Sequence, residues 1–198
     1  MKKRTLKPGN LLAPVPAALI SCRDAAGNDN LITLAWVGTV CSTPPMLSVS
    51  IRPERHSYQM IRETGEFAVN LTTEAMARMT DLCGVRSGRD TDKWELSGLH
   101  RQAASVISCP IVEESPVSLE CRVTQVIPLG SHDMFLAEIV AVDAAEDLFD
   151  ETDRMDLGKA GLIAYVHGAY QSLGRTLGTF GYSVRKKKKA GRPGFKKQ

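Results

Sequence analysis

The chain has 198 residues, 43% of them hydrophobic and 24% charged, with a net charge of +3. This length suits one domain that can fold without disulfides or a structural metal. The charge is uneven, because eight of the 25 basic residues and none of the 22 acidic residues follow position 184. The remaining 17 basic and 22 acidic residues leave the body at about −5. The composition therefore argues against a domain that binds nucleic acid through general basicity.

The charge pattern divides the chain into a domain at residues 1–182 and a basic C-terminal tail at residues 183–198. A polar, lysine-rich end of this kind is typical of a disordered, solubilising tail. Contact with nucleic acid or an acidic partner is the other interpretation of the tail. The first interpretation is the simpler one.

The cysteine pattern indicates reduced thiols in a cytoplasmic protein, because the five cysteines are odd in number and lack metal-ligand spacing. Cys41, among hydroxyl residues, is either a reactive thiol or, as we favour, a small buried side chain. Pro14 and Pro16 interrupt the apolar run after the basic N-terminus, which argues against a signal peptide. No run approaches the ~20 apolar residues of a membrane span.

The first third of the chain predicts strands joined by tight turns. Residues 17–22 form an expected strand, a polar turn occupies 24–30, and residues 31–37 are rich in β-branched and aromatic side chains. A loop is expected at 38–43, before a Pro-Pro pair. Residues 46–52 alternate cleanly, with Leu47, Val49 and Ile51 on the face that points to the core.

The rest of the chain adds short helices and a long hairpin. We expect a helix from Ser57, as its cap, to Thr64, a strand at 66–71, and a helix at 74–83. A loop follows at 85–98, then a hairpin of strands 117–127 and 134–142, a last strand at 162–166, and an irregular segment at 170–182. Long helical connections between successive strands, which a parallel sheet needs, are missing from this pattern. The prediction is a mainly β protein with a closed or partly closed antiparallel barrel and a few short helices.

A polar strand face is the first candidate site. Ser48, Ser50 and Arg52 share one side of the strand, and an arginine fork with hydroxyls nearby suits a phosphate monoester. The helix start that follows, with His56 and Ser57, provides free N–H groups that favour an anion. The competing interpretation is a solvated edge strand and an ordinary helix cap. Because the polar strand face and the helix start lie close together in the sequence, the phosphate site and the solvated surface are about equally supported.

A second candidate site lies just before the polar strand. Small residues beside Trp36, including Thr33 and Ala35, would let a flat ring approach the backbone. The alternative is that Trp36 is a core aromatic residue. Lys93, in the long loop, could reach a ring or a phosphate, although spacing alone favours a surface lysine.

The four histidines are isolated in sequence, so we expect no metal site. His132 lies in the hairpin turn, where it could meet a bound substrate or serve only as a turn residue. The sequence patterns of a hydrolase elbow, a P-loop and a Rossmann site do not occur.

Taken in order, these segments resemble the flavin reductase-like, FMN-binding split-barrel family, which includes flavoredoxin. The resemblance rests on four early segments, at residues 30–36, 42–45, 48–53 and 64–70. Later pieces also match: Cys83-Gly84, Asp92–Trp94, Cys109-Pro110, Leu119–Cys121, Gly130–Asp133, Tyr170 and Leu173-Gly174. The match runs from about residue 12 to residue 182, and the basic tail lies beyond it.

The resemblance implies a split antiparallel β-barrel, a homodimer, and FMN bound near the subunit interface. The main chain around Thr33, Ala35 and Trp36 would hold the isoalloxazine ring. The residues expected around the ribityl phosphate are Ser50, Arg52, His56 and Ser57. Asn70 and Lys93 would be peripheral contacts, and His132 would meet the nicotinamide of a donor.

The implied activity is a flavin reductase-like oxidoreductase that passes hydride or electrons between NADH or NADPH, flavin and an acceptor. Loss of Arg52 would then weaken FMN binding by about 1.5–3 kcal/mol. One alternative is an electron carrier that holds FMN and exchanges electrons with a protein or small-molecule partner without NAD(P)H. Another is a binding protein that keeps the barrel without flavin, with the tail touching nucleic acid.

Overall fold

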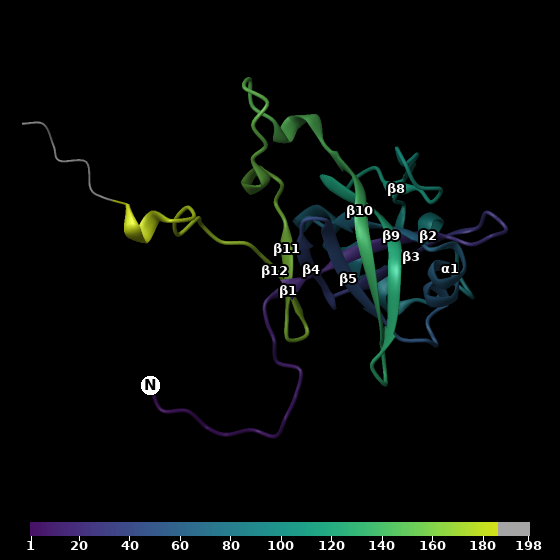
Figure 1. Ribbon diagram of the computed structural model, residues 1–198, viewed down its shortest axis with the longest axis horizontal. Coiled ribbons are helices and arrows are strands. Elements are labelled where there is room, and N and C mark those ends of the chain that lie inside the picture. Colours follow the sequence, from purple (N-terminus) through teal and green to yellow (C-terminus); the bar gives the residue numbers. More distant parts are fainter. Residues whose placement is uncertain (186–198) are drawn as a thin grey trace, which may run out of the picture.

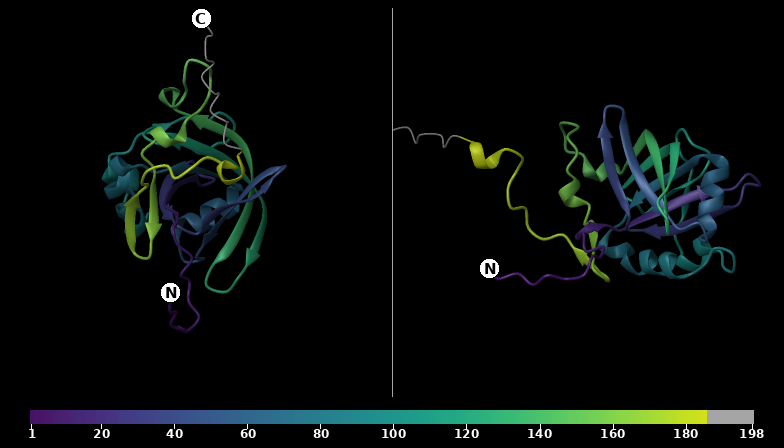
Figure 2. Two further views of the ribbon diagram at one scale, coloured as in Figure 1. Left: turned by 90° about the vertical axis from the view of Figure 1, so that its left-hand side faces the viewer. Right: turned by 60° about the horizontal axis from the view of Figure 1, so that its bottom comes forward.

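A curved, antiparallel seven-stranded sheet forms the body of the protein. The computed structural model describes residues 1–185, so most of the predicted tail, 186–198, lies outside the described residues. The strand order is β3-β2-β6-β9-β10-β5-β4, and β3 also contacts β5, so that the sheet curls into a barrel (Figures 1 and 2). The strands are β2 (Ala18–Arg23), β3 (Asp29–Leu34), β4 (Val37–Ser42), β5 (Pro45–Ile51), β6 (Glu66–Leu71), β9 (Val117–Pro128) and β10 (Asp133–Ala144). This architecture confirms the predicted mainly β, antiparallel fold.

Two small sheets complete the β structure. A three-stranded sheet has the order β1-β11-β12, and a separate pair joins β7 to β8. The strands are β1 (Val15–Pro16), β7 (Arg101–Gln102), β8 (Ile111–Val112), β11 (Ile163–Val166) and β12 (Ala169–Ser172). The segments before β1 and after β12 both extend away from the barrel on the same side (Figure 1).

The barrel interior follows the alternation read from the sequence. Leu47, Val49 and Ile51 of β5 are at most 2% exposed, whereas Ser48 and Ser50 between them are half-buried. Helix α1 (His56–Thr64) packs its apolar side into the same core, which also contains Phe67 of β6 and Phe135 of β10. Fully burying a side chain of this size contributes about 1.5–3 kcal/mol.

Two further helices cover the outer face of β2 and β3. They are α2 (Ala77–Val85), which follows a 3-10 turn η1 (Glu74–Met76), and α3 (Lys93–Ser97). Leu19 and Leu31 point outward from the barrel and pack with Cys83 and Trp94 of these helices. The other 3-10 turns are η2 (Glu146–Leu148), η3 (Leu157–Lys159) and η4 (Tyr182–Val184).

Three predictions of local structure were wrong. The predicted loop at 38–43 belongs to β4, because its β-branched residues pair with β5 across a turn at Pro44. The predicted loop at 85–98 contains α3. The Asp92 carboxylate caps this helix by accepting hydrogen bonds from the Trp94 and Glu95 N–H groups, and Gly98 ends it in the left-handed conformation. The segment predicted to be irregular, 170–182, begins within β12 and ends in η4.

The start of α1 also differs from the prediction. Arg55, not Ser57, occupies the cap position, and it makes no side-chain cap bond. Ser57 is a fully buried residue of the first helical turn. Its hydroxyl is therefore free to contact neighbouring side chains instead of the helix backbone.

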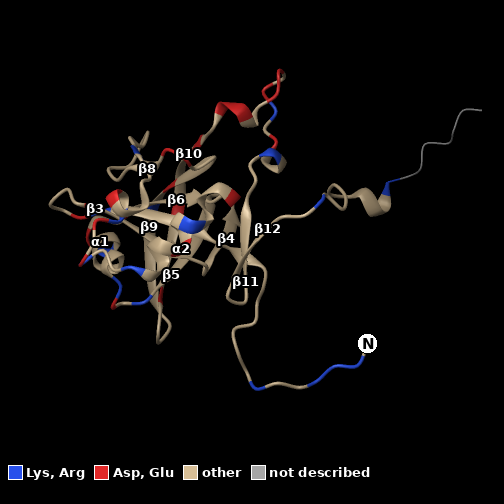
Figure 3. Ribbon diagram, turned by 180° about the vertical axis from the view of Figure 1, so that it is seen from behind, with Lys and Arg blue, Asp and Glu red and all other residues tan. Residues whose placement is uncertain are grey.

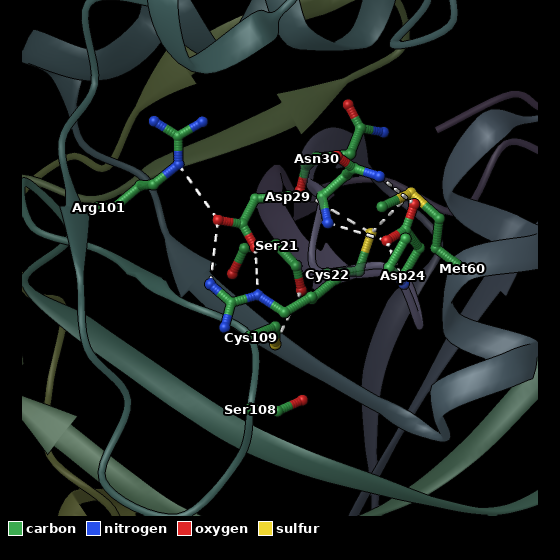
Figure 4. Close-up of polar contacts among 12 residues, drawn as sticks. Ser21, Cys22, Asp24, Asp29, Asn30, Met60, Arg101, Ser108 and Cys109 are labelled. Atoms are coloured by element: carbon green, nitrogen blue, oxygen red, sulfur yellow. Dashed lines mark hydrogen bonds and ion pairs between the residues drawn. The ribbon is translucent and has the colours of Figure 1, made fainter.

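The cysteines are free thiols, and Cys41 alone of the five is partly exposed. Cys22 and Cys109 lie on either side of Ser21 in the packed interior (Figure 4). Burial raises the pKa of Cys22 to about 12 and that of Cys83 to about 11. Burial therefore disfavours the thiolate form of both residues, as is usual for cysteines that serve in packing.

None of the helices within residues 1–185 has the length and apolar character needed to cross a lipid bilayer.

Candidate functional site

Two adjoining cavities lie beside the start of α1 and the end of β3. The larger has a volume of about 650 Å³ and the smaller about 230 Å³. Ile32, Arg55 and Gly84 line both, so the two spaces meet along one wall. The larger volume lies within the range of about 300–1,000 Å³ typical of cofactor and ligand sites.

Backbone and aromatic groups form much of the larger cavity. Ala35 and Trp36 connect β3 to β4 and lie outside the strand ladders, and the Trp36 carbonyl accepts a hydrogen bond from the Ser50 N–H at 2.9 Å. The Thr33 hydroxyl donates to the Thr80 carbonyl of α2, so this side chain ties the helix to the sheet. Trp36 is half-buried at the cavity wall and is not one of the core aromatic residues.

Segments from near both ends of the described chain line the larger cavity. The hairpin of β11 and β12 contributes Tyr165, His167 and Tyr170, and the N-terminal arm contributes residues 10–13. Tyr165 and Tyr170 pack edge to face with their ring centroids 5.6 Å apart. Burial and neighbouring Asp81 raise the pKa of Tyr170 to about 12, so its hydroxyl stays protonated. This side of the cavity combines aromatic surface with hydroxyl groups.

The smaller cavity is built around the first turn of α1. His56 and Ser57 line it, and no acidic residue occupies that turn. The first N–H groups of a helix have no partner within the helix, and the helix dipole makes this end positive. The position therefore suits an anion.

A buried contact joins this turn to β3. The Asn30 amide donates to the Ser57 hydroxyl at 2.8 Å, and both side chains are buried. Gly88 lies against the same asparagine, since a Cβ at Gly88 would be 2.2 Å from the Asn30 Oδ1 atom. Glycine at 88 thus lets the loop close over Asn30.

Lys93 supplies a buried cation to the smaller cavity. Its ammonium donates to the carbonyls of Leu31 and Cys83, each at 2.8 Å, and the residue is 4% exposed. Burial lowers the pKa of Lys93 to about 8. The interpretation of this residue as a surface lysine was wrong, because α3 turns its side chain toward β3.

Arginines surround the smaller cavity without matching carboxylates. Arg55, Arg86 and Arg89 line it, and within residues 1–185 none of them lies within 4.0 Å of a carboxylate oxygen. Basic segments flank α1 in Figure 3. Glu54 is the one acidic residue among those that line this cavity in the described part of the chain. The net positive charge adds to the anion preference of the helix start.

Arg52 and His132 lie together at the wall of the larger cavity. Ile51 and Asp133 form the last pair of the antiparallel β5–β10 ladder. Arg52, one residue after Ile51, and His132, one residue before Asp133, therefore lie at the same end of the sheet. Burial and the nearby Arg52 and Arg55 charges lower the pKa of His132. The His132 Nδ1 atom lies 2.9 Å from the Ser131 hydroxyl.

The structure thus divides the predicted site residues between the two cavities. Those at the larger cavity are Thr33, Ala35, Trp36, Ser50, Arg52 and His132, and those at the smaller are His56, Ser57 and Lys93. The four residues predicted to surround the phosphate are therefore divided between the cavities. Ser50 and Arg52 line the larger cavity, and His56 and Ser57 line the smaller one.

Asn70, predicted as a peripheral contact, lines neither of the two cavities. It is fully buried, and its amide nitrogen donates to the Leu19 carbonyl and the Ser21 hydroxyl, both at 3.0 Å. Its amide oxygen accepts from the Val112 N–H and the Ser118 hydroxyl. All of these contacts are internal, so Asn70 joins strands rather than facing a ligand.

Several residues of the site were not singled out from the sequence. They are Asn30, Asp81, Arg86, Arg89, Tyr165 and His167. The pattern Arg86-Ser-Gly-Arg89, two arginines around a Ser-Gly pair after a helix, is an anion-loop signal that could have marked part of this set. The remaining residues carry no local signal, because other segments bring them to the cavities.

Within residues 1–185, no group of three or more His, Cys, Asp or Glu side chains is arranged to hold a metal ion.

Residues 12–174 match the family model described as "Flavin reductase like domain". An uncharacterized protein of Aeropyrum pernix is 34% identical over 114 residues, which cover 57% of this chain and only 43% of that relative. A protein of Escherichia coli named FMN reductase (NADH) RutF is 29% identical over 56% of this chain and 70% of its own length.

The solved structure of flavoredoxin from Desulfovibrio vulgaris (Miyazaki F) superposes with a TM-score of 0.86 and 27% identity. The match covers 93% of this chain and 100% of that one. The predicted split barrel and the predicted family resemblance are thereby confirmed.

Proposed function

We propose that this chain, which belongs to the flavin reductase-like domain family, binds FMN across the two cavities and acts as an oxidoreductase. The observation that carries the proposal is the junction of an aromatic, backbone-lined cavity with a smaller one lined by cations at a helix start. A molecule with a flat ring at one end and a phosphate at the other matches this pair of environments.

The residues present fit FMN in both chemistry and size. We assign the phosphate to the smaller cavity, with Ser57, Lys93 and Arg89 as its principal partners. Charge-assisted hydrogen bonds and the positive end of α1 would hold the dianion there. The ring would lie in the larger cavity against Ala35 and Trp36.

When bound, FMN supplies the chemistry, accepting the hydride that a donor such as NAD(P)H loses and passing two electrons to an acceptor. The chain's own residues bind, orient and shield. The N-terminal arm and the β11–β12 hairpin line the larger cavity and would shield one side of a bound ring. His132, with its lowered pKa, is a neutral hydrogen-bonding group at neutral pH, suited to a polar group of a second ligand.

Two donor arrangements are consistent with this site. The name of the E. coli relative, FMN reductase (NADH), supports a hydride donor of the nicotinamide type for this chain. The similarity to a flavoredoxin over almost the whole chain supports the second candidate, an electron carrier that takes electrons from another protein. A flavin-free binding protein on the same barrel is the third alternative.

The visible spectrum of the purified protein tests the proposal. We expect flavin absorbance after addition of FMN and removal of the excess, and bleaching within seconds on anaerobic mixing with NADH or NADPH. Retention of colour without bleaching would favour the electron carrier. A protein that stays colourless after FMN addition would contradict both flavin-dependent functions.

We also propose that the protein is a homodimer. The segment after β12 holds large apolar side chains in water, with Leu177 81% and Phe180 105% exposed. A second copy of the chain would bury these apolar side chains, because exposed apolar surface of this kind is typical of a protein–protein contact. Light scattering should give twice the 21.6 kDa chain mass. A monomer would contradict the proposal.

The free state of all five cysteines supports a reducing compartment such as the cytoplasm as the proposed location.

A further inference from the structure

The site carries two groups of cations, whereas FMN carries one phosphate. Arg86, Arg89 and Lys93 line only the smaller cavity. Arg52 and His132 line only the larger one, and Arg55 lies at the wall between the two. The smaller cavity can therefore satisfy the flavin phosphate with its own charges.

Glu54 is a carboxylate that lies close to both groups of cations. It lines the smaller cavity, and its carboxylate lies 3.6 Å from the Arg52 guanidinium. Both side chains are exposed, at 64% and 51%, so this ion pair is weakly held and leaves most donors of the guanidinium free. Arg52 can thus bind an anion that approaches from the larger cavity.

The other charged groups around the larger cavity leave the Arg52 end positive. Asp81 is the one carboxylate among the described residues that line the cavity, and it lies on α2 next to Tyr170. Burial first, and then the charges of the nearby Arg52 and Arg55, lower the pKa of His132. A second ligand entering here would meet net positive charge, because the exposed ion pair of Arg52 with Glu54 is weak.

We infer that Arg52, together with His132, forms an anion subsite for a phosphate group of the nicotinamide dinucleotide donor, separate from the subsite of the flavin phosphate. This inference rests on the proposed FMN-dependent oxidation of NAD(P)H. An arginine fork suits the oxygens of a pyrophosphate or ribose phosphate, which a nicotinamide donor carries and its uncharged analogues lack. Arg52 is then a specificity-determining residue for the donor.

The experiment compares donors with and without phosphate on the FMN-loaded protein. In Arg52→Gln, kcat/KM for NADPH should fall at least tenfold relative to kcat/KM for uncharged 1-benzyl-1,4-dihydronicotinamide. An equal fall for NADH identifies the pyrophosphate, which both donors carry, and an unchanged value for NADH identifies the ribose phosphate, which only NADPH carries. The FMN dissociation constant of the variant should change less than threefold. Arg122→Gln is the matched control, because Arg122 is also 51% exposed and paired with a carboxylate, that of Glu66 at 3.1 Å.

Calorimetry with ADP-ribose and 2′,5′-ADP tests the subsite without turnover, in protein with and without FMN. Binding by the unaltered protein that weakens at least tenfold in Arg52→Gln supports the subsite. A stronger loss of 2′,5′-ADP than of ADP-ribose identifies a ribose phosphate, and the converse identifies the pyrophosphate.

Three results would overturn the inference. The first is an FMN affinity that falls as much in Arg52→Gln as in Arg89→Gln, because this would show that Arg52 binds the flavin phosphate. The second is an equal loss of rate with phosphate-bearing and uncharged donors. The third is no binding of either adenine ligand. If the unaltered protein does not bind FMN, the proposed function itself is contradicted. This outcome is distinguished from the other three because the protein then stays colourless after FMN is added.

Discussion

The two cavities share three wall residues but are built in different ways. The smaller is held by buried polar contacts, such as the 2.8 Å bonds from Asn30 to Ser57 and from Lys93 to two carbonyls. The larger is bounded by backbone, aromatic side chains, the N-terminal arm and the hairpin of β11 and β12. The smaller is therefore a rigid charged pocket, and the larger is a space whose cover comes from the chain's outer segments.

This difference makes two ligands useful as probes. FMN and riboflavin share the ring, and riboflavin lacks the phosphate. A change in the smaller cavity should alter FMN affinity alone, whereas a change in the larger cavity should alter the affinities of both ligands equally.

The largest effect is expected for Lys93→Met. It removes a buried cation and leaves the carbonyls of Leu31 and Cys83 without their donor. FMN binding should weaken by about 3 kcal/mol, or roughly a hundredfold, because hydrogen bonds to charged groups contribute about 1.5–3 kcal/mol each. Fluorescence titration measures this, and riboflavin affinity should change less than threefold. Thermal unfolding of Lys93→Met and Lys93→Arg distinguishes loss of the fold from loss of the site.

A somewhat smaller effect is expected for Arg89→Gln. The loss of one charge-assisted contact should weaken FMN binding by about 2 kcal/mol, or roughly thirtyfold. Because Arg89 is exposed and has no ion-pair partner within residues 1–185, the melting temperature should hardly change. Equal weakening of FMN and riboflavin would show that Arg89 acts on the ring and not on the phosphate.

Gly88→Ala should lower FMN affinity by an intermediate amount, through a steric clash and not through a change of charge. The new methyl group would collide with the Asn30 amide, and Asn30 cannot move without losing its bond to Ser57. We expect FMN affinity to fall about tenfold, equivalent to about 1.4 kcal/mol. Gly38→Ala is the control, because nothing lies within 4 Å of a Cβ at that position. An unchanged FMN affinity in Gly88→Ala would contradict the close packing of this loop.

Trp36→Leu probes the larger cavity. Loss of the aromatic wall should weaken FMN and riboflavin to the same extent, by about 1 kcal/mol or roughly fivefold. Parallel titrations with the two ligands measure the ratio. A selective loss of FMN affinity would place the phosphate in the larger cavity and reverse the assignment of the two spaces.

The smallest effect near neutral pH comes from the Lys93 proton. Burial lowers the pKa of the free protein's Lys93 to about 8, and a bound phosphate would raise it again. FMN affinity should therefore be nearly constant from pH 7 to about pH 8. Above that value binding has to take up a proton, and affinity should fall by up to tenfold for each pH unit. Lys93→Arg, which keeps its charge, should abolish this fall, and a fall of the same size in that variant would point to another group.

Part of the fold could be read directly from local patterns. The alternation in β5 predicted which three residues are buried, and the short connections predicted an antiparallel barrel. The loops at 38–43 and 85–98 were misjudged. In the first, pairing with β5 outweighed the Gly-containing sequence, and in the second the Asp92 cap and Gly98 stop were not recognised as bounds of a five-residue helix.

The candidate site could be predicted only in part, for a similar reason. The sequence placed Ser50, Arg52, His56 and Ser57 near one another, but it could not show that they face two different spaces. Asn70 and Lys93 carry no local signal of their surroundings. Both are polar side chains in ordinary local settings, yet the fold turns Asn70 toward buried strand partners and brings Lys93 from α3 to the carbonyl of Leu31.

The sequence by itself determined the barrel class, the family and the segments that carry the site, because alternation, turn residues and motif order are local properties of the chain. Only the tertiary structure decided which cations share a cavity, which lysine is buried and which histidine meets Arg52. Those facts depend on strand register and helix packing between segments far apart in the sequence, and no local pattern encodes the distances that result.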